Sequence, residues 1–152
     1  MGQLRIQNMK VGDKYVTPAR IITKTDVETF CSITGMMHPL FLSDDYIKSD
    51  EASQKIGLQA SVVPGQLSYA IMLGNLLRDQ IIDDVIVQLG SNNVKWPAPA
   101  YPYDMLRTEI EITGNRTTKT GDAAIVDYKW EVKNQNDVVV IDGNNTCMFR
   151  KK

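Results

Sequence analysis

The sequence predicts an α+β fold in which an antiparallel sheet covers one long apolar helix. Four runs rich in β-branched residues fill the second half of the chain, at 85–96, 105–114, 123–133 and 138–150, and turn residues separate them. A strongly apolar helical stretch at 66–78 precedes these runs, and shorter, more polar helical segments come before it. An apolar helix of this kind needs the face of a sheet to cover it.

Length and composition indicate one ordinary globular domain over residues 1–152. A chain of 152 residues is long enough to bury a single core, and two independent domains would each be small. Hydrophobic residues make up 43% of the chain and charged residues 23%, which excludes a disordered class. The net charge is −1 and no basic cluster exceeds Arg150-Lys151-Lys152, so nucleic acid is not an expected partner.

The sequence favours a cytoplasmic protein with no membrane partner. The first eight residues contain no apolar segment of signal length, and no run of eighteen apolar residues occurs anywhere in the chain. Cys31 and Cys147 form no C-x-x-C motif and have no pair of histidines beside them, so no metal site is expected. We expect two reduced, buried thiols.

The first helix should present a loop to the rest of the protein. Residues 12–22 are typical of a turn followed by a short strand. Thr25 and Glu28 then have the spacing of a capping box, which predicts a helix of about two turns. Gly35 stands where a left-handed C-terminal cap is expected, so the helix leads into the loop Met36 to Phe41.

Short helices or turns fit the polar segment 43–57, in which Asp44 and Asp45 are typical of a first helical turn, although a catalytic role for them is an alternative. The helix 66–78 follows Val62-Val63-Pro64-Gly65. Its spacing predicts one inner face, made of Leu67, Ala70, Ile71, Gly74 and Leu77.

Prolines and asparagines punctuate the second half. Pro97, Pro99 and Pro102 break the chain between the first two strands, and Tyr101, Tyr103 and Asp104 belong to this turn or line the mouth of a pocket. Residues 134–137, Asn-Gln-Asn-Asp, predict a hairpin turn between the last two strands.

The stretch Thr34-Gly35-Met36-Met37-His38-Pro39-Leu40-Phe41 resembles the motif T-G-D-x-N-P-x-H of the MaoC-like family, the (R)-specific enoyl-CoA hydratases and dehydratases. Met36 stands at the place of the family's catalytic Asp, and Phe41 at the place of its His. Further fragments agree in order: Val63-Pro64-Gly65, the segment 94–106, which is similar to K-F-x-x-P-V-x-x-G-D-x-L, and the segment 132–137, which is similar to V-x-N-Q-x-G.

This resemblance implies a hotdog fold, a curled antiparallel sheet wrapped around a long central helix. It also implies an acyl-CoA or other acyl thioester as ligand, coenzyme A only as part of that ligand, no separate cofactor, and a homodimer or a heteromer. Residues of the matched segments, Pro39, Val63 and Trp96, are implied substrate contacts. The backbone N–H groups of Gly65 and Gln66, at the start of the long helix, would bind the thioester oxygen.

The proton-transferring pair of the motif is missing, because neither a thioether nor a phenyl ring can accept a proton at biological pH. The leading hypothesis is therefore an acyl-thioester-binding protein without the usual dyad, serving as the non-catalytic subunit of a heteromeric enoyl-CoA hydratase or dehydratase. Basic side chains near the matched strands, Lys95, Arg107 and Arg116, are candidates for contacts with the phosphates of coenzyme A.

Two alternatives stay open. In the first, the chain is an active hydro-lyase or acyl-CoA thioesterase in which His38, the only histidine, activates water and Gly65 and Gln66 bind the oxyanion. The competing interpretation of His38 is a residue that caps a turn before Pro39. In the second alternative the protein is an assembly or regulatory module whose pocket is filled by Met36, Met37 and Phe41.

Overall fold

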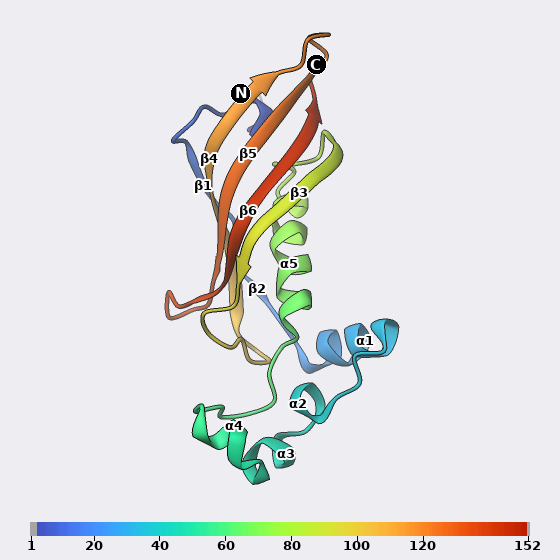
Figure 1. Ribbon diagram of the computed structural model, residues 1–152, viewed down its shortest axis with the longest axis vertical. Helices are drawn as coiled ribbons and strands as arrows, with labels where there is room; N and C mark the ends of the chain where they lie inside the picture. Colours follow the sequence, from blue (N-terminus) through green and yellow to red (C-terminus); the bar gives the residue numbers. More distant parts are fainter. Residues whose placement is uncertain (1–2, 152) are drawn as a thin grey trace.

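Residues 3–151 are described by a computed structural model, in which a curved six-stranded antiparallel sheet packs against one long helix (Figure 1). The predicted α+β architecture is confirmed. The helical segments are η1 (Ile6–Asn8), α1 (Lys24–Thr34), α2 (Pro39–Leu42), α3 (Asp44–Ser49), α4 (Glu51–Lys55) and α5 (Gly65–Arg78). The strands are β1 (Lys14–Val16), β2 (Arg20–Ile21), β3 (Val85–Lys95), β4 (Met105–Thr117), β5 (Ala123–Lys133) and β6 (Val139–Arg150).

The strand order is β1-β4-β5-β6-β3, and β2 pairs with the beginning of β4. All four strands predicted in the second half are present, and β3 lies at the edge of the sheet. The predicted hairpin turn at 134–137 joins β5 to β6. There Asn134 Oδ1 accepts hydrogen bonds from the amides of Asn136 and Val138, at 2.9 and 3.1 Å.

Helix α1 begins two residues earlier than the sequence suggested. Thr23 is the N-cap, its side chain accepts from the amide of Asp26, and the Asp26 carboxylate accepts from the amide of Thr23. The expected box at Thr25 and Glu28 is therefore wrong, and the helix has 11 residues instead of two turns. Asp26 also pairs with Arg20 at 3.1 Å, which favours this box over the later one. Gly35 ends the helix in the left-handed region, as predicted.

Between α1 and α5 the chain forms three short helices that gather beyond one end of the sheet, near the start of α5 (Figure 1). The predicted loop from Met36 to Phe41 is only partly a loop, because α2 begins at Pro39, where proline is well suited to a first helical turn. Ser43 and Asp50 cap α3 and α4, in agreement with short helices in this segment. Residues 12–22 contain two short strands, where one was expected.

Helix α5 buries a different face from the predicted one. Leu67 and Ile71 are buried as expected, whereas Ala70, Gly74 and Leu77 are exposed. The remaining inward positions are Ser68, Met72, Asn75 and Leu76. Counting only apolar residues misplaced the face, because the polar side chain of Asn75 points inward and donates to the carbonyl of Leu106 at 3.2 Å.

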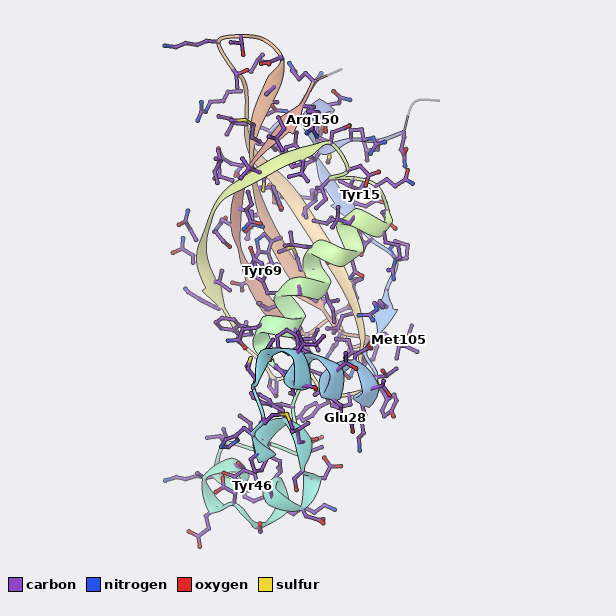
Figure 2. All side chains as sticks on the ribbon, turned by 90° about the vertical axis from the view of Figure 1, so that its right-hand side faces the viewer. Tyr15, Glu28, Tyr46, Tyr69, Met105 and Arg150 are labelled. Carbon is purple, nitrogen blue, oxygen red and sulfur yellow. The ribbon has the colours of Figure 1, made fainter. Side chains whose placement is uncertain are left out.

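The hydrophobic core is mainly aliphatic and includes a few aromatic and sulfur-containing side chains. Tyr69 of α5 meets the buried ring of Trp130 edge-on, with centroids 5.4 Å apart, and Figure 2 shows Tyr69 beside the helix. Cys31 and Cys147 are buried and free. Burial raises the pKa of both thiols.

No helix within residues 3–151 is long and apolar enough to cross a membrane. The single domain and the cytoplasmic location stay predictions.

The cap at Thr23 can be tested directly. Thr23→Ala removes one side of the capping box and should lower the free energy of unfolding by about 1 kcal/mol. Thr25→Ala is the matched control, because Thr25 is exposed inside the helix and alanine favours helix there. Chemical denaturation measures both, and a larger loss in Thr25→Ala would contradict the position of the cap.

Candidate functional site

The motif loop is shaped by the end of α1. The amide of Gly35 donates to the carbonyl of Cys31 at 2.9 Å, and the hydroxyl of Thr34 accepts from the amide of Met36 at 3.3 Å. Thr34 itself donates to the carbonyl of Phe30 at 2.7 Å. The Thr-Gly pair of the motif therefore turns the backbone out of the helix and contributes no reactive group.

His38 acts as the N-cap of α2. Its Nδ1 accepts from the amide of Leu40 at 3.0 Å, which requires an unprotonated Nδ1. The ring is exposed and packs edge-on against the rings of Phe41 and Tyr46, with centroids 6.5 and 5.9 Å away. The capping interpretation of this residue accounts for the hydrogen bond that its ring accepts, and the aromatic contacts hold the ring at the start of α2.

An apolar groove lies between the short helices and the start of α5. It has a volume of about 410 Å³, within the range of small-molecule sites. Its lining consists of Leu40, Phe41, Ile56, Leu58, Val62, Val63, Gly65, Gln66, Ser68, residues 96–100 and Val140. Of the implied substrate contacts, Val63 and Trp96 line it and the exposed Pro39 does not.

Phe41 is the only one of the three proposed plugging residues that reaches the groove. Met36 and Met37 lie outside its lining, and Met37 is exposed. The groove is therefore open although the motif's two reactive positions carry apolar side chains, and His38 lies outside the lining as well.

Two backbone hydrogen bonds fix the walls of the groove. The amide of Val62 donates to the carbonyl of Leu40 at 3.0 Å, and the amide of Val63 donates to the carbonyl of Ala100 at 2.8 Å. The segment before α5 is thus tied on one side to α2 and on the other to the proline-rich turn after β3.

The start of α5 presents unused donors to this groove. The carbonyl of Pro64 accepts from the amides of Leu67 and Ser68, at 3.0 and 3.2 Å. The amide N–H groups of Gly65 and Gln66 donate no hydrogen bond to any other part of residues 3–151, and both residues line the groove. The first N–H groups of a helix have no partner inside the helix and carry the positive end of its dipole.

The indole of Trp96 lies against Gly65. A Cβ atom on Gly65 would stand 2.7 Å from Cδ1 of Trp96, so only glycine fits beneath this ring. The indole therefore occupies the space that a side chain at position 65 would need. Trp96 is 49% exposed, so one side of the ring still faces the groove and solvent.

Asp44 anchors the segment that leads to α5. Its Oδ1 accepts from the amide and the hydroxyl of Ser61, at 2.9 and 2.8 Å, and Lys24 lies 3.5 Å from Oδ2. The backbone hydrogen bond from Ser61 is the main reason why the pKa of Asp44 is lowered. These contacts hold the groove wall in place, and Asp44 does not line the groove.

The candidates for phosphate binding do not come together. Arg107 is engaged with Glu109 at 3.1 Å and with Asp137, and Arg116 lies nine residues further along β4, roughly 30 Å away. Lys95 ends β3 beside Trp96 and is exposed. Only Lys95 is next to a residue of the groove.

The proline-rich turn is held by Asp104. This buried carboxylate accepts from the amide of Tyr101 at 2.9 Å and from the side chain of Gln135 at the same distance. Tyr103 is exposed, in agreement with a turn that displays aromatic residues. The hydroxyl of Tyr101 accepts from the amide of Gln59 at 3.2 Å, which connects the turn to the segment after α4.

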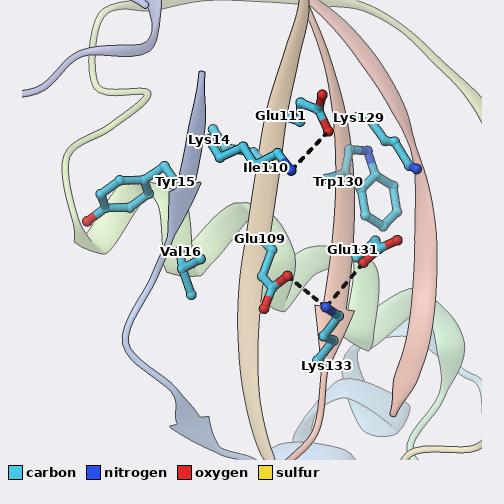
Figure 3. Close-up of a pocket in the computed structure, with 10 residues that line it drawn as sticks. All are labelled: Lys14, Tyr15, Val16, Glu109, Ile110, Glu111, Lys129, Trp130, Glu131 and Lys133. Atoms are coloured by element: carbon cyan, nitrogen blue, oxygen red, sulfur yellow. Dashed lines mark hydrogen bonds and ion pairs between the residues drawn. The ribbon is translucent and has the colours of Figure 1, made fainter. Parts of the chain in front are cut away.

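A second depression, of about 290 Å³, lies on the outer face of the sheet (Figure 3). Its charged side chains neutralise one another. Lys133 lies 2.8 Å from Glu109 and 3.6 Å from Glu131, and Lys14 lies 4.0 Å from Glu111. The hydrogen bond from Lys133 lowers the pKa of Glu109. We interpret this area as a solvated ion-pair surface. Among residues 3–151, no three His, Cys, Asp or Glu side chains cluster in a way that could hold a metal ion.

Sequence reasoning missed several walls of the groove. Ile56, Leu58 and residues 97–100 approach the start of α5 only through the tertiary fold. The one available signal was the apolar character of Ile56 and Leu58 in an otherwise polar segment.

Comparisons with known proteins agree on one family. The family profile described as "MaoC like domain" matches residues 6–134. The β-methylmalyl-CoA dehydratase of Chloroflexus aurantiacus is 30% identical over 138 residues, which cover 91% of this chain and 37% of that protein. The mesaconyl-CoA hydratase of Cereibacter sphaeroides is 27% identical over 104 residues, or 68% of this chain and 30% of that protein. The chain spans about a third of the length of these curated relatives.

Solved structures show the same fold. A putative MaoC domain protein dehydratase from Chloroflexus aurantiacus superposes with a TM-score of 0.85 at 27% identity, covering 97% of this chain and 40% of that one. A Mycobacterium tuberculosis protein with a double hotdog fold superposes with a TM-score of 0.80 at 16% identity, covering 97% and 44%. The curled sheet around α5 is thus a hotdog fold.

The contact between Asp44 and Ser61 predicts a pH-dependent stability. A carboxylate whose pKa is lowered by folding stabilises the protein above its ordinary pKa of about 3.9, and this contribution disappears as the pH falls through the lowered value. Asp44→Asn keeps an acceptor but removes the charge. The variant should be less stable than the parent at pH 7, and the difference should shrink on acidification.

Denaturant midpoints between pH 7 and pH 3 measure this effect. Asp45→Asn is the matched control, since Asp45 is exposed in the same helical turn. A difference for Asp44→Asn that stays constant over this pH range would contradict the assignment.

Proposed function

Because the chain belongs to the MaoC-like family, we propose that it binds an acyl-CoA or related acyl thioester in the groove at the start of α5. In this proposal the thioester oxygen accepts from the amides of Gly65 and Gln66, and the chain serves as the non-catalytic subunit of a heteromeric enoyl-CoA hydratase or dehydratase. Coenzyme A enters only as part of the ligand.

The main support for the proposal is that an apolar groove is lined by two residues, Gly65 and Gln66, whose backbone N–H groups have no partner within residues 3–151. A thioester carbonyl gains most from N–H groups that are already oriented and shielded from bulk water. The amides of Gly65 and Gln66 meet the first of these requirements, because they belong to the first turn of α5, make no other hydrogen bond within residues 3–151 and come from residues that line the apolar groove. The helix dipole adds to their attraction for a partly negative oxygen.

The non-catalytic part of the proposal rests on Met36 and Phe41. General acid and base groups each contribute about 10²- to 10⁴-fold to such reactions, and these two side chains offer neither. Phe41 instead forms part of the groove wall. We therefore expect a thioester to be held without being hydrated at the usual rate.

A second hotdog domain would supply the missing chemistry. Two solved structures that match 97% of this chain are more than twice as long as the matched part, and one of them has a double hotdog fold. Strand β3 is a long edge strand with the exposed apolar residues Ile86, Val87 and Leu89, and such edges pair readily with another chain. Pairing along β3, in a homodimer or a heteromer, is part of this proposal.

The alternative with His38 as catalytic base ranks second. The ring is exposed, lies outside the groove lining and uses Nδ1 for the cap of α2. A base must reach the water that it activates, and this position leaves only Nε2 on the solvent side. The assembly-module alternative required a filled pocket, whereas a groove of about 410 Å³ is open.

Crotonyl-CoA tests the proposal through one backbone atom. Gln66→Pro removes a single N–H group in the first helical turn, where proline is tolerated. Losing one hydrogen bond should weaken crotonyl-CoA binding by about threefold to tenfold. Gln66→Ala keeps the N–H and should bind like the parent. Calorimetry measures affinity, and a hydration assay on the same samples should show no turnover by the chain alone.

Equal affinity of the Pro and Ala variants would show that the amide of Gln66 is not a ligand contact. Rapid hydration by the chain alone would remove the non-catalytic role while leaving the binding site intact. Circular dichroism confirms that both variants retain their helix content.

Pairing through β3 predicts that Leu89→Lys produces a monomer, since a charged residue on an edge strand opposes pairing with another strand. Val16→Lys is the matched control, because Val16 lies on the opposite edge strand β1 and both residues are 51% exposed. Analytical ultracentrifugation gives the oligomeric state. Dissociation by Val16→Lys but not by Leu89→Lys would place the interface elsewhere.

A further inference from the structure

The lining of the groove is uncharged. None of its fifteen described lining residues carries a charge. The side chains of Gln66 and Ser68 are the only strongly polar ones, and they lie at the start of α5, where the thioester would be. The walls further from α5, formed by Leu40, Ile56 and Leu58, are aliphatic.

Basic side chains near the groove lie outside its lining. Lys55, next to Ile56, is exposed and is not among the lining residues. Lys24 pairs with Asp44 at 3.5 Å behind the wall, and Arg107 is held by Glu109 and Asp137. Lys95 precedes Trp96 at the end of an exposed edge strand and is not among the lining residues. A second carboxylate on the acyl group would therefore find no cation among the described residues that line the groove.

Such a carboxylate gains no charged partner from aliphatic walls and loses hydration wherever it packs against them, which costs free energy. The two curated relatives act on acyl groups, β-methylmalyl and mesaconyl, that do carry a second carboxylate. The groove of this chain is unsuited to acyl groups of that class.

We propose that the groove selects thioesters of uncharged, apolar acyl groups and rejects those that carry a second carboxylate. The selection resides in the aliphatic wall formed by Leu40, Ile56 and Leu58. This inference rests on the proposed function, because it names the class of acyl group that the same site takes.

Butyryl-CoA and succinyl-CoA form a matched pair of probes, because succinyl carries a carboxylate where butyryl has its terminal methyl group. Calorimetry on the full chain, in the oligomeric state that it adopts, should show butyryl-CoA binding at least about tenfold more tightly than succinyl-CoA. Hexanoyl-CoA, with two more methylene groups, should bind about tenfold more tightly than butyryl-CoA. Free coenzyme A measures the contribution of the carrier alone.

A single substitution should reverse the selection. Ile56 lines the groove yet is 76% exposed, so Ile56→Arg adds a cation at the wall without opening the core. This variant should bind succinyl-CoA several-fold more tightly than the parent does. Ile56→Gln, polar but uncharged, should not, and thermal unfolding shows that both variants are folded.

Two binding results distinguish a failure of the inference from a failure of the proposed function. Butyryl-CoA that binds no more tightly than free coenzyme A defeats the proposed function, because the groove then holds no acyl group. Succinyl-CoA that binds the parent as tightly as butyryl-CoA, in a protein that prefers both to free coenzyme A, overturns the inference alone.

Discussion

The attachment of α5 to strand β4 sets the geometry of everything else in this protein. Asn75, almost fully buried, donates to the carbonyl of Leu106 at 3.2 Å, and Thr108 donates its hydroxyl to the carbonyl of Met72 at 3.2 Å. Buried polar groups need such partners, so these bonds fix the rotation of the helix about its axis. That rotation decides which side of the first turn, with Gly65 and Gln66, opens onto the groove.

Much of the fold could be predicted from the sequence because its signals are local. The β-branched runs that form β3 to β6 and the hairpin turn at 134–137 depend on residues close together in the chain. The cap of α1 was predicted wrongly at Thr25 and Glu28. Thr23 and Asp26 have the same spacing, and the contact of Asp26 with Arg20 favours them. The inner face of α5 was predicted wrongly because Asn75 was counted as polar surface.

The candidate site was less accessible to sequence reasoning. Gly65 and Gln66 were identified through the resemblance, and the structure places both at the groove. The indole of Trp96 beneath which Gly65 fits comes from the far end of β3, and no local pattern predicts a contact between residues so distant in the chain. His38 was ambiguous for a related reason. A histidine before a proline is compatible with both capping and catalysis, and only the contacts of its ring distinguish the two roles.

In the proposed function, recognition and proton transfer reside in different parts of the scaffold. The donors at the start of α5 are backbone amides and do not depend on side-chain identity, whereas the motif positions held by Met36 and Phe41 carry no group that transfers a proton. A chain of this kind is free to keep a ligand site while a second hotdog domain supplies the chemistry.

The two tryptophans have opposite surroundings, so intrinsic tryptophan fluorescence can report on the groove. Trp130 is fully buried beside Tyr69, whereas half of Trp96 is open to water at the groove. Emission from a shielded indole is insensitive to what happens outside the core, so a change of intrinsic fluorescence on adding a small molecule comes from Trp96. Binding in the groove can therefore be followed by tryptophan fluorescence, without a label or a coupled enzyme.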